Sequence, residues 1–129
     1  IMSQNRDALL KHIPGVTISG YTDLSINGLK FSGNAQRRLK HTVLFHGTFL
    51  YNTHLVPSIS KYLAMPTKEP DYRNNRSHND FIQPLSLSKE LIKTALISQW
   101  NAENSLPLDV INNLEFDPKY LDNTWHTKC

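Results

Sequence analysis

The stretch TDLSINGLKFSGNAQRRLKHTVLFHGTF, residues 22–49, decides the fold of this chain. Near its start, Asn27-Gly28 separates two runs of strand-forming residues. This dipeptide is typical of a type I′ turn, because both central positions of that turn need a positive φ. We therefore expect Leu29–Phe31 to return antiparallel to Asp23–Ile26. Further along, Thr42–Tyr51 has the composition and alternation of another strand.

Patterns on either side of this stretch complete the prediction. We expect helices over residues 3–13 (with Ser3 as the cap), 55–63 and 88–100, and a strand over 16–20. The fold class is therefore α+β, a mainly antiparallel small sheet with flanking helices. Residues 64–81 form a long polar connection, and connections of this length are commonly functional. At least one edge of so small a sheet needs covering, so residues 1–129 are either a single domain or part of one.

The composition is that of a globular, soluble protein. Hydrophobic residues make up 39% of the 129 residues and charged residues 19%, and no apolar run reaches the roughly 18 residues of a membrane span. Cys129 is the single cysteine of the sequence, so no internal disulfide is possible and we expect a cytoplasmic location. As the last residue it has no fixed base beside it, so it makes a poor nucleophile. The net charge of +3 suits anionic small molecules or acidic protein partners, whereas nucleic-acid-binding domains usually carry a denser basic stripe.

Lys30 is the first candidate for a functional site, since it follows the predicted turn and precedes a run of small residues, Ser32-Gly33-Asn34-Ala35. A lysine on such a strand is most often a solvated side chain. The backbone of small residues, however, can approach a ligand and offer N–H donors. An ammonium beside such donors can hold a carboxylate, a phosphate or an oxyanion. The residues alone leave both interpretations open.

Two further places carry an excess of positive charge. Arg37 and Arg38, next to Lys40, form either a charged edge strand that resists aggregation or a basic rim for an anionic ligand or an acidic protein. Arg73 and Arg76 belong either to a solvated loop or to a loop that contacts an anion. The absence of interleaved aromatic residues around the first cluster ranks nucleic-acid binding last.

The tripeptide His46-Gly47-Thr48 places a histidine and a glycine on the predicted strand over 42–51. The histidine has no second histidine or carboxylate at metal-ligand spacing, so we expect no metal site there. At Gly47, the missing side chain lets a ligand or a neighbouring backbone approach.

Together these residues resemble the lipoate–protein ligase and octanoyltransferase family, whose catalytic domain is biotin/lipoate ligase-like. The resemblance rests on residues 22–49 and on a later YL…P…DYRNNRSHNDF segment, and it covers about residues 3 to 100. The family pattern is an Asn-Asp or Thr-Asp, a turn, then Lys-x-Ser/Ala-Gly-x-Ala and a later His-Gly-Thr/Ser.

The resemblance implies a role for each matching residue. Lys30 is the expected catalytic residue, close to the acyl carbonyl and the adenylate phosphate, where its charge stabilises the transition state of acyl transfer. The segment of about residues 52–76 matches a region that moves to cover the adenylate in the ligases. Residues expected to line the pocket are Ser32, Gly33, Asn34, Ala35, His46, Gly47 and Thr48. Candidates for contact with the carrier or with an anion are Arg37, Arg38, Arg73 and Arg76.

The same resemblance implies substrates and partners. The expected ligands are lipoate or octanoate, and ATP with Mg²⁺. The acceptor is a lysine on the lipoyl carrier domain of a 2-oxoacid dehydrogenase or on a glycine cleavage H-type protein.

Three features depart from the family pattern. The chain contains no Arg-Arg-x-Ser-Gly-Gly-Gly segment, which in the family binds substrate and nucleotide, so it resembles the C-terminal half of the catalytic domain. His54 stands where the family usually has Asp, and no internal cysteine matches the thioester-forming octanoyltransferases. We therefore expect a truncated, ligase-type acyltransferase that is inactive alone. The alternative is a non-catalytic binding subunit that pairs with a separate chain or with itself.

Overall fold

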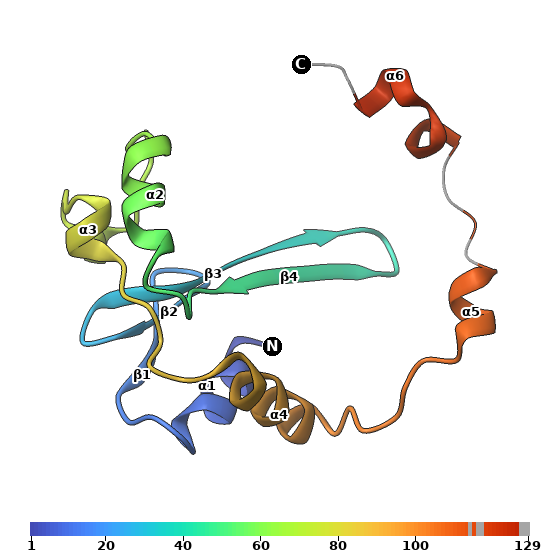
Figure 1. The fold of residues 1–129 in the computed structure, drawn as a ribbon, viewed down its shortest axis with the longest axis horizontal. Helices are drawn as coiled ribbons and strands as arrows, with labels where there is room; N and C mark the ends of the chain where they lie inside the picture. The colour runs from blue at the N-terminus through green and yellow to red at the C-terminus, as the bar shows by residue number, and fades with distance from the viewer. Residues whose placement is uncertain (114, 116–117, 127–129) are drawn as a thin grey trace.

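The structure is a computed structural model that describes residues 1–113, 115 and 118–126. It confirms the predicted α+β class: a four-stranded antiparallel sheet in the order β1-β2-β3-β4, with flanking helices (Figure 1). The elements in chain order are α1 (Met2–Leu10), β1 (Val16–Ser19), β2 (Asp23–Ile26), β3 (Leu29–Arg38), β4 (Val43–Phe49), α2 (Leu55–Tyr62), the 3₁₀ helix η1 (Asp71–Arg73), α3 (His78–Phe81), α4 (Lys89–Trp100), α5 (Leu108–Asn112), the 3₁₀ helix η2 (Pro118–Leu121) and α6 (Asn123–His126).

The turn between β2 and β3 is the two-residue turn that the sequence predicts. Asn27 and Gly28 have φ values of 51° and 73°, which is the positive φ that a type I′ turn requires at both positions. Antiparallel pairing begins at once, with Ile26 opposite Leu29.

A β-bulge follows in β3, next to the candidate lysine. Ser25 pairs with Lys30 but Leu24 pairs with Ser32, so Phe31 has no partner on β2. Bulges bend a strand and change the direction of its side chains. Phe31 is buried in the core, whereas its neighbour Lys30 lines cavities on the surface of the sheet.

β3 is longer than the expected Leu29–Phe31, and that boundary prediction was wrong. β4 pairs with the second half of β3, from Ser32 opposite Phe49 to Arg38 opposite Val43. Residues 33–35, whose small side chains suggested a backbone open to ligands, are therefore strand residues. The cause is the pairing with β4, which follows β3 after the short connection of residues 39–42 and overrides the weak strand propensity of these small residues.

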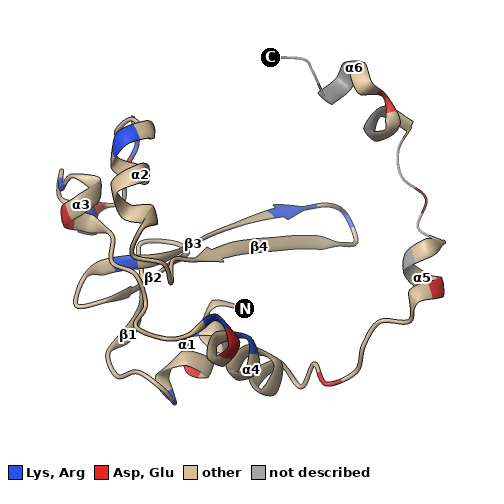
Figure 2. Cartoon of the chain, in the orientation of Figure 1, with Lys and Arg blue, Asp and Glu red and all other residues tan. Residues whose placement is uncertain are grey.

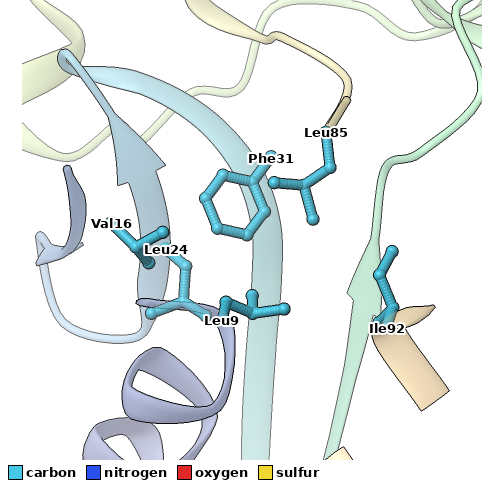
Figure 3. Packing of buried hydrophobic residues seen from close by; sticks show 6 residues of the cluster. All are labelled: Leu9, Val16, Leu24, Phe31, Leu85 and Ile92. Carbon is cyan, nitrogen blue, oxygen red and sulfur yellow. The ribbon is translucent and has the colours of Figure 1, made fainter. Parts of the chain in front are cut away.

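The hydrophobic core lies between the sheet and the helices α1 and α4 (Figure 3). It contains 6 buried side chains: Leu9, Val16, Leu24, Phe31, Leu85 and Ile92. Burying each of these contributes roughly 1.5–3 kcal/mol. At the helix ends, the Trp100 indole N–H donates a 2.9 Å hydrogen bond to Asn5 Oδ1. Trp100 itself is 44% exposed, since it is the last residue of α4.

The predicted helices are present, with differences at their ends. Ser88, expected as the first residue of its helix, is the cap of α4 and accepts a 3.2 Å hydrogen bond from the backbone N–H of Leu91. Ser3 does not cap α1, which begins one residue earlier at Met2. The connection over residues 64–81 contains η1 and α3 and is thus more ordered than a plain loop.

The β3–β4 hairpin extends past the core, and we call residues 35–46 the arm (Figure 1). Its apolar side chains are open to solvent: Leu39, Val43 and Leu44 are 60%, 53% and 61% exposed. The hydrophobic core therefore lies under the first half of β3 and leaves the arm uncovered.

Candidate active site

Lys30 is held in place by a carboxylate of the neighbouring strand. Its Nζ lies 2.8 Å from Asp23 Oδ1, and the two side chains are 29% and 12% exposed. Partial shielding from water makes this pair stronger than an ordinary surface ion pair. The hairpin register explains the contact. Ser25 lies opposite Lys30, and Asp23, two residues before Ser25 on β2, lies on the same face of the sheet and diagonal to Lys30.

Tyr72 holds the other oxygen of the same carboxylate. Its hydroxyl donates a 2.7 Å hydrogen bond to Asp23 Oδ2. Burial, together with this hydrogen bond, raises the pKa of Tyr72 well above its ordinary value, so the phenol remains a donor at neutral pH. Asp23 thus links a phenol and an ammonium through its two oxygens.

Gly33 leaves the space in which the Lys30 side chain lies. A Cβ on Gly33 would be 3.2 Å from both Cε and Nζ of Lys30, which is closer than side chains normally pack. The small-residue run thus permits a close approach, and the group that approaches the backbone of β3 is the ammonium of Lys30 itself.

Two cavities meet at Lys30. The larger is mainly apolar and has a volume of about 530 Å³; its lining residues are Lys30, Phe31, Ser32, Gly33, Thr48, Phe49, Leu50, Leu55, Ile59, Leu63, Arg73, His78, Phe81 and Ile82. The smaller is more polar and has a volume of about 270 Å³; its lining residues are Tyr21, Thr22, Asp23, Lys30, Lys68, Glu69 and Pro70. Lys30 belongs to both linings.

Helix α2 contributes an apolar stripe to the larger cavity. Leu55, Ile59 and Leu63 line it, although no residue of α2 is buried in the core. A stripe that faces a cavity instead of a core is suited to an apolar ligand. At the start of this helix, the Asn52 side chain accepts a 2.9 Å hydrogen bond from the His54 backbone N–H and so stabilises the turn.

Arg73 holds the connection over residues 64–81 together internally, and Arg76 fastens it to the β2–β3 turn. Arg73 is 5% exposed and forms an ion pair with Glu69 at 3.3 Å. Arg76 donates a 2.9 Å hydrogen bond to the carbonyl oxygen of Gly28, in the β2–β3 turn. Both guanidinium groups lie over the Phe81 ring, at 4.7 and 5.2 Å. The expected contact of these arginines with an anion stays a prediction.

Among the residues expected to line the pocket, Ser32, Gly33 and Thr48 join Lys30 at the larger cavity. Asn34 and Gly47 instead face each other at the base of the arm. The Asn34 side chain donates to the Thr22 carbonyl oxygen at 2.7 Å, and a Cβ on Gly47 would collide with Asn34. What approaches Gly47 is therefore the side chain of a neighbouring strand.

The other predicted residues lie on the arm, away from Lys30. Ala35, Arg37, Arg38 and His46 are all exposed, and Figure 2 shows the basic colouring of the arm. Residues 24–68 contain no Asp or Glu at all, so this stretch of the chain is basic.

Sequence reasoning missed Asp23 and Tyr72 as site residues, and it missed that the α2 stripe faces a cavity. Asp23 was predictable, since a two-residue turn at Asn27-Gly28 puts it diagonal to Lys30. Tyr72 carried no comparable signal, because its position depends on how a long connection folds back.

Two general findings bound the chemistry of the described part of the chain. No group of three or more His, Cys, Asp or Glu residues among the described residues is placed to hold a metal ion. No helix within those same residues is long and apolar enough to cross a membrane. The prediction that concerns Cys129 lies outside the described residues.

Comparison with known proteins identifies the family. Residues 6–98 match the model of the lipoyl protein ligase A/B catalytic domain. The chain therefore belongs to the lipoyl protein ligase A/B catalytic domain family, as the resemblance indicated. No curated protein and no solved structure matched the chain.

Proposed function

We propose that this chain binds lipoate or octanoate and takes part in transferring the acyl group to a lysine of a carrier domain. The observation that supports this best is the position of Lys30 between the two cavities. The apolar cavity suits a medium-length acyl chain, and the smaller, more polar cavity, lined by Lys30 and Lys68, suits the phosphate of an activated acyl group. The ammonium of Lys30 then lies where the carboxyl end and the phosphate meet.

In this proposal, Lys30 stabilises negative charge as the reaction proceeds. The amine nitrogen of the carrier lysine attacks the acyl carbonyl carbon, and a negatively charged oxygen develops. The bond from that carbon to the phosphate oxygen then breaks, adenosine monophosphate leaves with the electron pair, and the amine releases its proton to solvent. A fixed ammonium in a partly dehydrated site stabilises both the oxyanion and the leaving phosphate.

Activation of the acyl group needs ATP and Mg²⁺. Asp23 is occupied by Lys30 and Tyr72, so Mg²⁺ would be held chiefly by the nucleotide's phosphates, as is usual for this ion. The 129 residues contain no Arg-Arg-x-Ser-Gly-Gly-Gly segment. We propose that activation requires such a segment to be supplied, and that the chain alone is silent with free acid and ATP.

We further propose that the carrier docks near the arm. Arg37 and Arg38 are exposed there, in the stretch of residues 24–68 that has no acidic residue. A carrier with an acidic face, such as a lipoyl domain of a 2-oxoacid dehydrogenase or a glycine cleavage H-type protein, would be steered to this surface by charge.

The test supplies octanoyl-adenylate, so that the activation step is not needed. The chain is mixed with a lipoyl carrier domain, and acylation of the carrier is followed by intact mass. We expect the chain to accelerate acylation and Lys30→Ala to lose that acceleration. If the wild-type chain neither accelerates acylation nor binds octanoate, the proposal is wrong.

One observation favours a second function, that of a binding subunit. β4 is an edge strand of the sheet among the described residues, and the exposed apolar residues of the arm lie beside it. Such an edge is a template for pairing with another chain. Size-exclusion chromatography over a range of concentrations tests this function, which a concentration-independent monomer with full hydrogen-exchange protection of β4 would exclude.

A further inference from the structure

We propose that Tyr72 is a positioning residue for Lys30, acting through the Asp23 carboxylate. This inference deepens the proposed function, and it rests on that function only for the role of Lys30. Tyr72 does not touch the lysine itself. Its effect passes through the one carboxylate that both groups share.

The geometry of Asp23 carries the argument. Oδ1 accepts from the Lys30 ammonium at 2.8 Å and Oδ2 accepts from the Tyr72 hydroxyl at 2.7 Å. A carboxylate held through one oxygen only can rotate about its side-chain bonds, whereas one held through both oxygens has a single orientation. The second contact therefore determines where the ammonium is held, and charge-assisted hydrogen bonds are the strong class of such contacts.

Tyr72 is itself well fixed, as a positioning residue must be. Its ring packs on Phe81 with centroids 5.1 Å apart. Its carbonyl oxygen accepts a 2.8 Å hydrogen bond from Arg76. On the other side the ring lies close to Gly20, where a Cβ would be 3.3 Å from Tyr72 Cε1. The folded connection thus carries the hydroxyl to Asp23 on a rigid support.

The apolar cavity lies elsewhere. Among the described residues, Tyr72 is not part of its lining. Loss of the hydroxyl should therefore leave acyl binding intact and disturb only the lysine. In acylation from octanoyl-adenylate, we expect Tyr72→Phe to lower kcat roughly 10-fold with little change in KM.

The closing experiment reads the position of Lys30 without any acyl transfer. The intact chain is treated with limiting acetic anhydride, and the modification of each lysine is measured by peptide mass spectrometry. An ammonium held against Asp23 is shielded from the reagent. We expect Tyr72→Phe and Asp23→Asn each to raise labelling of Lys30 roughly 3- to 10-fold, and the double variant to add nothing further.

Matched controls make the result specific. Tyr62→Phe alters an exposed tyrosine of α2 and should leave the labelling of Lys30 unchanged, and Lys68 serves as the internal reference. Unchanged labelling of Lys30 in Tyr72→Phe would overturn the inference. So would a rise shared equally by Lys68, which shows loosening of the whole segment. Since labelling needs no activity, it decides the role of Tyr72 even where the wild-type chain fails to transfer an acyl group.

Discussion

The two halves of β3 carry basic residues in opposite environments. Lys30, in the first half, lies in a partly buried network between two cavities. Arg37 and Arg38, in the second half, are exposed on the arm. One strand thus presents a positive charge that is held by an ion pair and two positive charges that are exposed to solvent.

The difference shows how the surroundings of a charge determine what it can do. Water and salt screen the charges of the arm, which leaves them suited to steering a partner from a distance. A lysine that is held by an ion pair and partly shielded from water, as Lys30 is by Asp23, can stabilise negative charge that develops at a single atom. The following predictions test this division, beginning with the largest expected effect.

Removal of the Lys30 side chain should have the largest effect on the rate of carrier acylation, because its charge is the one held in the first half of β3. Lys30→Ala is expected to lower the rate of carrier acylation from octanoyl-adenylate by roughly 10²- to 10³-fold, the range seen when one oxyanion-stabilising group is lost. Lys61→Ala, an exposed lysine of α2 outside both cavity linings, is the matched control and should leave the rate unchanged. An equal loss of acylation rate in Lys30→Ala and Lys61→Ala would show that Lys30 has no special role.

Gly33 and Gly47 lie where the first half of β3 passes into the second, and substitutions at them separate effects on stability from effects on acylation. Gly47→Ala should lower the free energy of unfolding by about 1–3 kcal/mol, because the new methyl group meets an Asn34 side chain held by hydrogen bonds. Gly33→Ala should cost less than about 1 kcal/mol, since the Lys30 side chain can move away, but it should reduce acylation. Urea unfolding and the acylation assay measure both. A larger stability loss for Gly33→Ala than for Gly47→Ala would contradict the geometry.

The Tyr72 phenol, which is linked to Lys30 through Asp23, should contribute to the pH dependence of the free energy of unfolding. The pKa of Tyr72 is raised in the folded chain, so above about pH 10 the unfolded state releases this proton and the folded state retains it. The unfolded state then binds fewer protons, and stability falls as pH rises, by at most about 1.4 kcal/mol per pH unit and by less where solvent screens the site.

Tyr72→Phe should remove this part of the alkaline loss, and Asp23→Asn should reduce it by lowering the pKa of Tyr72. Urea unfolding between pH 9 and 11 provides the measurement, with Tyr62→Phe as control. An identical alkaline loss in wild type and Tyr72→Phe would exclude the effect.

The smallest effects are expected on the arm. Arg37→Glu and Arg38→Glu should each raise KM for the carrier several-fold and weaken its salt dependence, with stability within about 0.5 kcal/mol of wild type. Kinetics at two ionic strengths test this, and Lys89→Glu on α4 is a control of equal charge change. The same increase in KM for the control would show a general effect of net charge.

How far the sequence predicts this molecule also differs between the halves of β3. The Asn27-Gly28 turn is a local signal, so the hairpin, and with it the Asp23–Lys30 pair, follows from the sequence. The second half of β3 depends on its pairing with β4, and the connection of residues 39–42 between them has no turn signal as strong as Asn-Gly. The boundary at Phe31 was therefore placed wrongly.

The candidate site was predictable only in part, for the same reason. Lys30, Ser32 and Gly33 are close in sequence, and the family pattern identifies them. Tyr72 and the α2 stripe reach the site through a connection whose path no periodicity reveals. Local patterns thus predict the strand that carries the lysine, whereas the walls around it come from tertiary folding.

In the proposed function, an acyl chain occupies the cavity lined by the α2 stripe, with its carboxyl group at Lys30. Methyl NMR of the intact chain during titration with octanoate observes this binding without any acyl transfer. We expect saturable shifts at Leu55, Ile59 and Leu63, with weaker binding in Lys30→Ala. Shifts that are absent, that fall on the exposed Leu106 and Leu108 instead, or that are unchanged by Lys30→Ala would contradict it.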